Sequence, residues 1–152
     1  MGDQQPQGES ERQPYVEDRH EGCLAHADLM HIGHTRYLQA ARALGDLLVV
    51  GVNSDASVRR LNKGPERPIR NERDRAYVLA ALEMVSAVVI FDEDTPRELV
   101  TAVQPDVIVK GGDYDPDTIV GAAEVRARGG RVVVIPLTPG HSTTNTVNKL
   151  RG

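Results

Sequence analysis

The chain has few of the features that mark secreted or membrane-spanning proteins. Its 152 residues include one cysteine, Cys23, which excludes an internal disulfide framework and favours a reducing compartment. No apolar run approaches the roughly 18 residues that a membrane-spanning helix needs, and the first residues are polar, unlike a signal peptide. These absences predict a cytoplasmic protein that neither enters a membrane nor is exported.

The commonest phosphate-binding signatures of α/β proteins are missing as well. Neither GxxxxGK[ST] nor a GxGxxG after an apolar run occurs, which excludes a Walker loop and a dinucleotide fingerprint. The net charge of −4 belongs to residues 1–23, which hold six acidic and two basic side chains, and the remaining charges cancel. No broad basic surface for nucleic acid is therefore expected.

Composition divides the chain into two regions. Residues 1–27 are polar and carry too little apolar surface to offset the entropy of ordering, so we expect a disordered tail. Residues 28–152 have the length of one domain. They contain four short β-branched apolar runs, at 47–52, 87–91, 107–109 and 132–135. Continuous runs of this kind are typical of strands buried on both faces of a parallel sheet.

Helical patterns alternate with these runs. They cover 35–44, 72–84, 96–103 and 116–128, with Gly45 as an expected C-cap and Thr95 as an expected N-cap. The alternation predicts an α/β fold with a doubly wound parallel sheet. Ligands of such folds bind beyond the carboxyl ends of the strands.

The segment DLMHIGHT at 28–35 leads into the first helical pattern and holds the clearest candidates for chemistry. His31 and His34 lie three residues apart at a helix start, where they can share one face, and Gly33 lets backbone N–H groups approach a ligand closely. A helix start attracts phosphate, and imidazoles there can donate to charge that develops on a phosphoryl oxygen. The alternative is a pair of ordinary loop histidines.

A zinc site is a second interpretation of the same region. His20, Cys23 and His26 lie just before His31 and His34, with spacings that zinc can use. The first three residues belong to the expected tail, so the phosphate interpretation is preferred.

Polar and glycine-rich residues follow the other apolar runs, where the fold predicts the site. The candidates are Asn53, Asp55, Lys110, Gly111, Asp113, Ser142, Thr143 and Thr144. The basic stretch 59–75 suits a phosphate clamp, and we prefer Arg75 because it lies in the first turns of a helix, where it can reach the edge of the sheet. A turn, helix N-caps and a solvated charged face are the alternative interpretations of these residues.

Together these segments resemble the nucleotidylyltransferase superfamily marked by HxGH, and within it the heptose 1-phosphate adenylyltransferase domain of ADP-heptose synthases. The matching segments are DLMHIGHTRYLQAARALGD at 28–46, GVNSDASVRRL at 51–61, RPIRNERDRAYVLAALE at 67–83, FDEDTP at 91–96, PDVIVKGGDY at 105–114 and GHSTTNTVNKL at 140–150. The resemblance implies a Rossmann-like nucleotidylyltransferase domain over 28–152.

The implied reaction moves AMP from ATP to D-glycero-β-D-manno-heptose 1-phosphate and forms ADP-heptose and pyrophosphate. The resemblance implies that Mg²⁺ binds the ATP phosphates and has no protein ligand. It also implies that the domain can form a homodimer. A cytidylyltransferase acting on a polyol or sugar phosphate and a non-catalytic nucleotide-binding module are the alternatives.

The resemblance also implies roles for the candidate residues. His31 and His34 would stabilise the transition state, and Asp28 would orient the first loop. The others would contact nucleotide or phosphate: Gly33, Asn53, Asp55, Arg75, Lys110, Gly111, Asp113, Ser142, Thr143 and Thr144.

One departure from the family concerns the first strand. The family begins with a buried strand that runs into a GCFD-type segment, whereas here residues 24–27 separate Cys23 from Asp28. The stretch QPYVEDRHEG has no apolar run, so we expect the first strand to be degenerate or missing.

Overall fold

The computed structural model describes residues 14–16, 30–61, 65–112, 114–136 and 149–150. Its sheet has five parallel strands in the order β3-β2-β1-β4-β5. The strands are β1 (Pro14–Val16), β2 (Val49–Asn53), β3 (Ala87–Phe91), β4 (Val107–Gly111) and β5 (Arg131–Ile135). The predicted α/β fold with a parallel sheet is confirmed.

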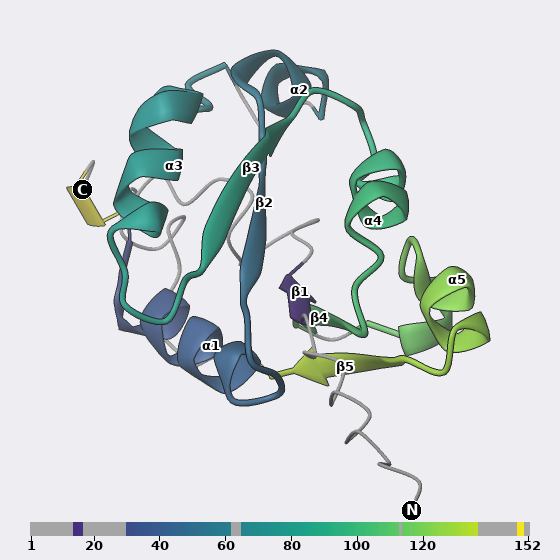
Figure 1. Cartoon of the computed structure of the whole chain (residues 1–152). Helices are drawn as coiled ribbons and strands as arrows, with labels where there is room; N and C mark the ends of the chain where they lie inside the picture. Colours follow the sequence, from purple (N-terminus) through teal and green to yellow (C-terminus); the bar gives the residue numbers. More distant parts are fainter. Residues whose placement is uncertain (1–13, 17–29, 62–64, 113, 137–148, 151–152) are drawn as a thin grey trace, which may run out of the picture.

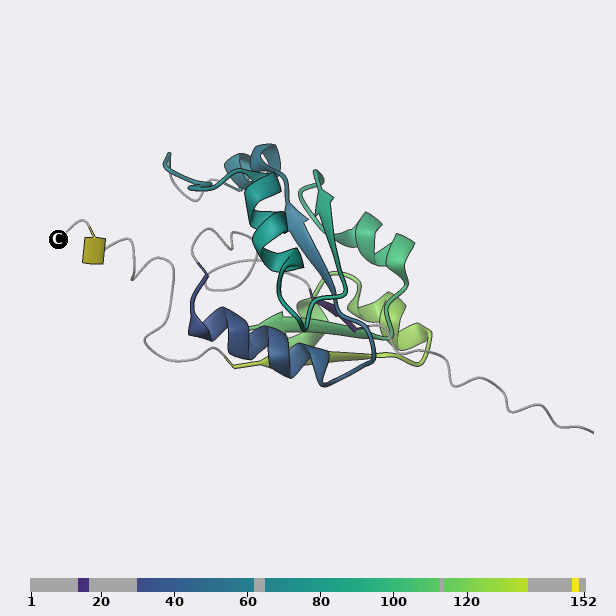
Figure 2. The ribbon, with the colours of Figure 1, turned by 60° about the vertical axis from the view of Figure 1, so that its left-hand side comes forward.

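Helices cover both faces of this sheet (Figures 1 and 2). They are α1 (Ile32–Arg42), α2 (Asp55–Arg60), α3 (Glu72–Ala80), α4 (Arg97–Val103), the 3₁₀ turn η1 (Pro116–Thr118) and α5 (Ala122–Ala127). Helices α1 and α3 pack on one face, where Leu38 and Leu79 join Val50 in a fully buried core. Helices α4 and α5 pack on the other face, around Ile108.

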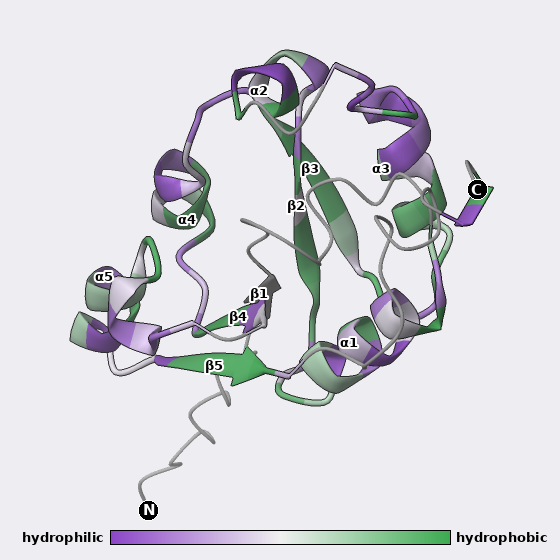
Figure 3. Ribbon diagram, turned by 180° about the vertical axis from the view of Figure 1, so that it is seen from behind, coloured by the Kyte–Doolittle hydropathy of each residue, from purple (hydrophilic) through white to green (hydrophobic). Residues whose placement is uncertain are grey.

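Burial differs between the inner and outer strands. Every residue of β4 and residues 50–53 of β2 are buried, as expected for strands covered on both faces. Strands β3 and β5 form the two edges of the sheet and are only partly covered, so the prediction of complete burial is wrong for them. In Figure 3 strands β2, β3 and β5 are mostly apolar, whereas the helices combine polar and apolar residues.

The central strand β1 is degenerate rather than missing. It has three residues, and Tyr15 pairs with Val49 of β2 on one side and with Ile108 of β4 on the other. For residues 14–16 the expected disordered tail is therefore wrong. A segment of three residues is too short to show a strand pattern in the sequence. In the fold, the neighbouring strands β2 and β4 pair with the backbone of this segment on both sides. The rest of 1–27 lies outside the described residues.

Several helix boundaries differ from the predictions. Helix α1 begins at Ile32, so the two histidines belong to its first turn, and its C-cap is Ala43 rather than Gly45. Helix α4 has Pro96 rather than Thr95 at its N-cap. The pattern over 116–128 is interrupted at Gly121, where φ is 86°. Helix α2 was not predicted, because its six residues are too short for a periodic pattern.

Candidate active site

The first turn of α1 is closed by two histidines. His31 is the N-cap, with an extended backbone, and its Nδ1 accepts a hydrogen bond from the backbone N–H of Gly33 at 3.1 Å. The backbone N–H of His31 donates in return to Nδ1 of His34 at 3.3 Å. This is a reciprocal capping box in which imidazoles take the places usual for Ser or Thr and for Glu or Gln.

The capping box determines which ring nitrogen carries the proton. Each Nδ1 accepts an N–H, so it cannot hold a hydrogen, and the proton of each neutral ring is on Nε2. The two ring centroids are 3.9 Å apart, and His34 is only 2% exposed. The capping geometry therefore holds two Nε2–H donors at the start of one helix.

Gly33 serves this cap through its own backbone. Its N–H donates to His31, so that N–H is occupied rather than directed at a ligand. The predicted contribution of Gly33 to phosphate binding then rests on its small size.

Helix α1 is anchored to β4 by a buried tyrosine. The hydroxyl of Tyr37 donates to the backbone carbonyl of Val109 at 3.1 Å. Tyr37 is one helical turn beyond His34, and Val109 directly precedes Lys110. This bond therefore places the histidines relative to the end of β4. Tyr37 was not among the predicted site residues, because an apolar face of a helix predicts burial but not a hydrogen-bond partner.

At the end of β4, Lys110 is 5% exposed and its Nζ lies 4.3 Å from the ring centroid of Tyr114. Gly111 is the last residue of the strand. Gly112 follows with φ of 115°, and a Cβ at this position would come within 3.0 Å of the Tyr114 ring. The φ of Gly112 lies in the region that favours glycine, and the ring of Tyr114 two residues on packs against the Lys110 ammonium. Tyr114 is a second residue that sequence reasoning missed.

At the end of β2, the predicted site residues Asp55 and Arg75 contact each other. Arg75 has no exposed surface, and its Nη2 lies 2.7 Å from Oδ1 of Asp55. Its Nε donates to the backbone carbonyl of Arg70 at 3.1 Å. The structure thus brings the two residues together as an ion pair in which Arg75 is buried and Asp55 is partly exposed. Arg75 was predicted to reach the edge of the sheet, and it does so by holding the first residue of α2.

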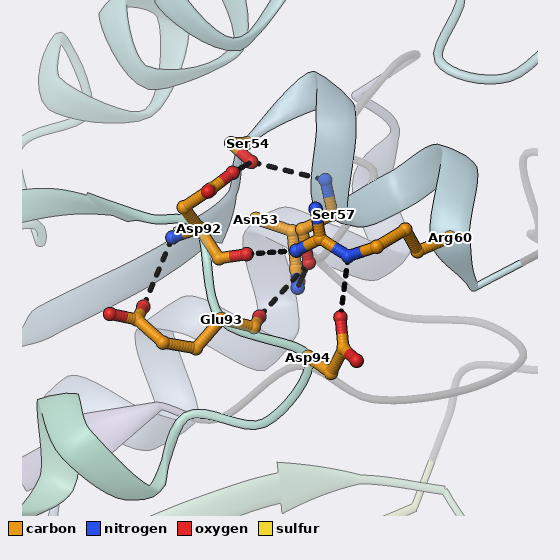
Figure 4. A network of polar contacts seen from close by, with 7 residues as sticks. All are labelled: Asn53, Ser54, Ser57, Arg60, Asp92, Glu93 and Asp94. Carbon is orange, nitrogen blue, oxygen red and sulfur yellow. Dashed lines mark hydrogen bonds and ion pairs between the residues drawn. The ribbon is translucent and has the colours of Figure 1, made fainter.

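A polar network joins α2 to the segment after β3 (Figure 4). Ser57 accepts a hydrogen bond from Nδ2 of Asn53 at 2.9 Å and donates to the backbone carbonyl of Glu93 at 3.0 Å. Ser54 donates to the carboxylate of Asp92. This network fixes the turn between β2 and α2, where Asn53 and Asp55 lie.

Arg60 closes the outer side of this network. Its Nε donates to Oδ1 of Asp94 at 2.7 Å, and its Nη2 donates to the backbone carbonyl of Asp92. The hydrogen bond to Asp94 raises the pKa of Arg60 above its ordinary value. The basic stretch 59–75 is therefore partly engaged by carboxylates of the chain itself.

The side-chain carboxyl groups of Glu93 and Glu98, beside this network, form a hydrogen bond with each other. A hydrogen bond between the side chains raises the pKa of Glu98. The pKa of Glu93 is lowered, first by a hydrogen bond with its own backbone N–H and then by the one with Glu98. Both side chains are fully open to solvent, so the pair affects local titration rather than the core.

Several candidates lie outside the described residues: Asp28, Asp113, Ser142, Thr143 and Thr144, together with His20, Cys23 and His26 of the zinc alternative. Within the described ranges, no group of three His, Cys, Asp or Glu side chains is placed to hold a metal ion. In that same part of the chain, no helix has the length and apolar character to cross a membrane.

The order of the parallel strands and the histidine-capped helix after the central strand define a nucleotidyltransferase-type α/β domain. The family described as cytidylyltransferase-like matches residues 26–148, which is most of the chain. The chain belongs to this family.

Curated relatives share more than half of the aligned residues. The bifunctional protein HldE of Syntrophotalea carbinolica is 57% identical over 129 residues, which are 85% of this chain and 26% of that protein. HldE of Geotalea uraniireducens is 58% identical over 130 residues, 86% of this chain and 26% of that protein. The chain thus spans about a quarter of the length of these relatives.

A solved structure is also similar. The lipopolysaccharide core biosynthesis protein from Thermoplasma volcanium GSS1 superposes with a TM-score of 0.62 at 26% sequence identity. The similarity covers 84% of this chain and 95% of that one. It therefore extends over nearly the whole of that chain, which has the same fold.

Proposed function

We propose that this domain transfers AMP from ATP to D-glycero-β-D-manno-heptose 1-phosphate, forming ADP-heptose and releasing pyrophosphate. The observation that carries the proposal is the histidine capping box, which leaves the proton of both neutral rings on Nε2 at the start of α1. The identity to two HldE proteins supports the same assignment, as does the similarity to a lipopolysaccharide core biosynthesis protein.

In this reaction an oxygen of the sugar phosphate attacks the α-phosphorus of ATP in line, and the bond from that phosphorus to the leaving pyrophosphate breaks. Negative charge grows on the phosphoryl oxygens, so donors already in place stabilise the transition state more than the ground state. His31 and His34 supply such donors through Nε2, and Lys110 supplies a cation from the end of β4. No covalent enzyme intermediate is needed, so positioning and electrostatics carry the rate.

Mg²⁺ is expected to accompany ATP and to neutralise charge on its phosphates. The carboxylates in the described part of the site are engaged by the chain, with Asp55 on Arg75 and Asp92 on Ser54. This suits Mg²⁺, which keeps several waters and binds through substrate phosphates rather than through a protein cage. We therefore propose that the ion enters with the nucleotide.

The test is an assay of pyrophosphate release from the purified chain with each nucleoside triphosphate and each of two acceptors, heptose 1-phosphate and glycerol 3-phosphate. Turnover only with ATP and heptose 1-phosphate is the expected result. Turnover restricted to CTP would instead support the cytidylyltransferase alternative. ATP binding without pyrophosphate release from any acceptor would support a non-catalytic nucleotide-binding module.

A further inference from the structure

Asn53 ends β2 at the carboxyl edge of the sheet, and its side chain has no exposed surface. Its amide lies beside Ser57 in the network of Figure 4. Nδ2 of Asn53 and Oγ of Ser57 are 2.9 Å apart, and Oγ of Ser57 is 3.0 Å from the backbone carbonyl of Glu93. The chain of contacts thus runs from amide to hydroxyl to carbonyl.

This chain of contacts fixes which way the amide faces. A backbone carbonyl can only accept, so Ser57 must give its single hydroxyl hydrogen to Glu93. Ser57 then has only lone pairs left for Asn53, and the neighbouring atom of Asn53 must be the NH₂ group. The Oδ1 atom consequently faces away from Ser57.

That oxygen is an unusual atom in the described part of the molecule. It is buried, yet it accepts no hydrogen bond there, whereas Ser54 and Ser57 in the same turn have partners. Buried acceptors are rarely left without a donor, because removal from water is costly. Asn53 lies next to the central strand, at the edge of the sheet where α1 begins. A bound substrate at this edge can supply the missing donor.

We propose that Oδ1 of Asn53 accepts a hydrogen bond from an uncharged donor of the substrate, a hydroxyl or an amino group, and thereby selects the substrate. The inference rests on the proposed function, and it changes the role expected for Asn53 from the sequence. An ionised phosphate oxygen has no hydrogen to give, so Oδ1 is not a phosphate ligand. The donor belongs either to the nucleoside of ATP or to the sugar of the acceptor.

A binding cycle tests the proposal and distinguishes the two sources. Dissociation constants are measured by calorimetry for the native chain and for Asn53→Ala. The first series of ligands is ATP, its 2′-deoxy and 3′-deoxy analogues and the ATP analogue whose base lacks the 6-amino group. The second series is heptose 1-phosphate and its monodeoxy analogues. One analogue should bind the native chain about tenfold more weakly than its parent, and Asn53→Ala should reduce this ratio to about one. If every ratio is the same in both proteins, the proposal is wrong.

Because Asn53 is buried, the variant is accompanied by a measurement on the native chain. With carbon-13 at the asparagine side-chain carbonyls, the Asn53 signal should shift when the hydroxyl- or amino-bearing ligand binds and not when its deoxy or deamino analogue binds. A shift produced by inorganic tripolyphosphate alone would show a phosphate ligand and overturn the proposal. Asn71→Ala, which removes an exposed asparagine that caps α3, serves as the matched control and should leave all ratios unchanged.

Pyrophosphate release is recorded separately, so failure of the inference can be told from failure of the proposed function. Normal turnover with identical ratios in native and Asn53→Ala proteins refutes only the role of Asn53. A ratio that depends on Asn53, without turnover on any acceptor, refutes the reaction and supports the hydrogen bond.

Discussion

Replacement of His34 separates its structural role from its chemical one. His34→Ala removes the acceptor that holds the backbone N–H of His31, and loss of such a cap costs about 1 kcal/mol. The His34 side chain is also only 2% exposed, so its truncation leaves a cavity that costs about 1–2 kcal/mol more. We therefore expect the free energy of unfolding to fall by about 2–3 kcal/mol.

His34→Glu is the matched variant. Glutamate at the third helical position is the usual partner in a capping box, so it can restore the bond to the N–H of His31. A carboxylate has no hydrogen to donate at neutral pH, so the transition-state donor stays absent. Because position 34 is buried, the cost of desolvating the new carboxylate opposes the restored cap, so we expect no net gain in stability over His34→Ala. We expect kcat of His34→Glu to remain about 10²-fold or more below native, as for comparable oxyanion donors.

Stability is measured by urea unfolding at 25 °C, and kcat by pyrophosphate release at saturating ATP and heptose 1-phosphate. His34→Ala should lose about 10²-fold in kcat at a temperature where it is fully folded. Near-native kcat in His34→Glu would show that the cap is the whole role of His34. Unchanged stability in His34→Ala would refute the capping box itself.

Three further predictions concern the fold around the site. Gly121→Ala should cost about 2–4 kcal/mol, because φ is 86° and the new Cβ would lie 2.7 Å from a Val100 methyl group. Gly129→Ala, with φ of 83° and open space, should cost only about 1 kcal/mol in the same urea assay. Arg75→Met should cost about 1–3 kcal/mol, because it removes a buried cation whose partner Asp55 is itself partly exposed, and equal stability would contradict this. The raised pKa of Glu98 means that its stabilising contribution is present at low pH and lost as pH rises through that pKa. Glu98→Gln should therefore raise the thermal midpoint at pH 7 and not below about pH 4.

Local patterns predicted most of the fold. The β-branched runs that became β2, β3, β4 and β5 need only hydrophobicity and strand propensity to be recognised, and the alternation with helices then limits the topology. The HxGH segment was placed at a helix start from its glycine and the pattern that follows. These features depend on residues close together in the chain, so a single sequence contains them.

The central strand shows why other parts could not be predicted. Pro14–Val16 has no strand pattern, and it is a strand because β2 and β4 leave a gap whose backbone groups it satisfies on both sides. Partial exposure of β3 and β5 has the same origin, since the place of a strand in the sheet follows from topology rather than from its own residues.

The sequence by itself determined the fold class, the helix start that carries the two histidines and the strand ends where polar residues gather. Only the tertiary structure decided that Arg75 binds Asp55, that Tyr37 joins α1 to β4 and that the amide of Asn53 turns its oxygen away from Ser57. The physical reason is that a hydrogen bond or ion pair depends on atomic distances within about 3 Å. Residues 20 or 72 positions apart reach such distances only when the core has packed.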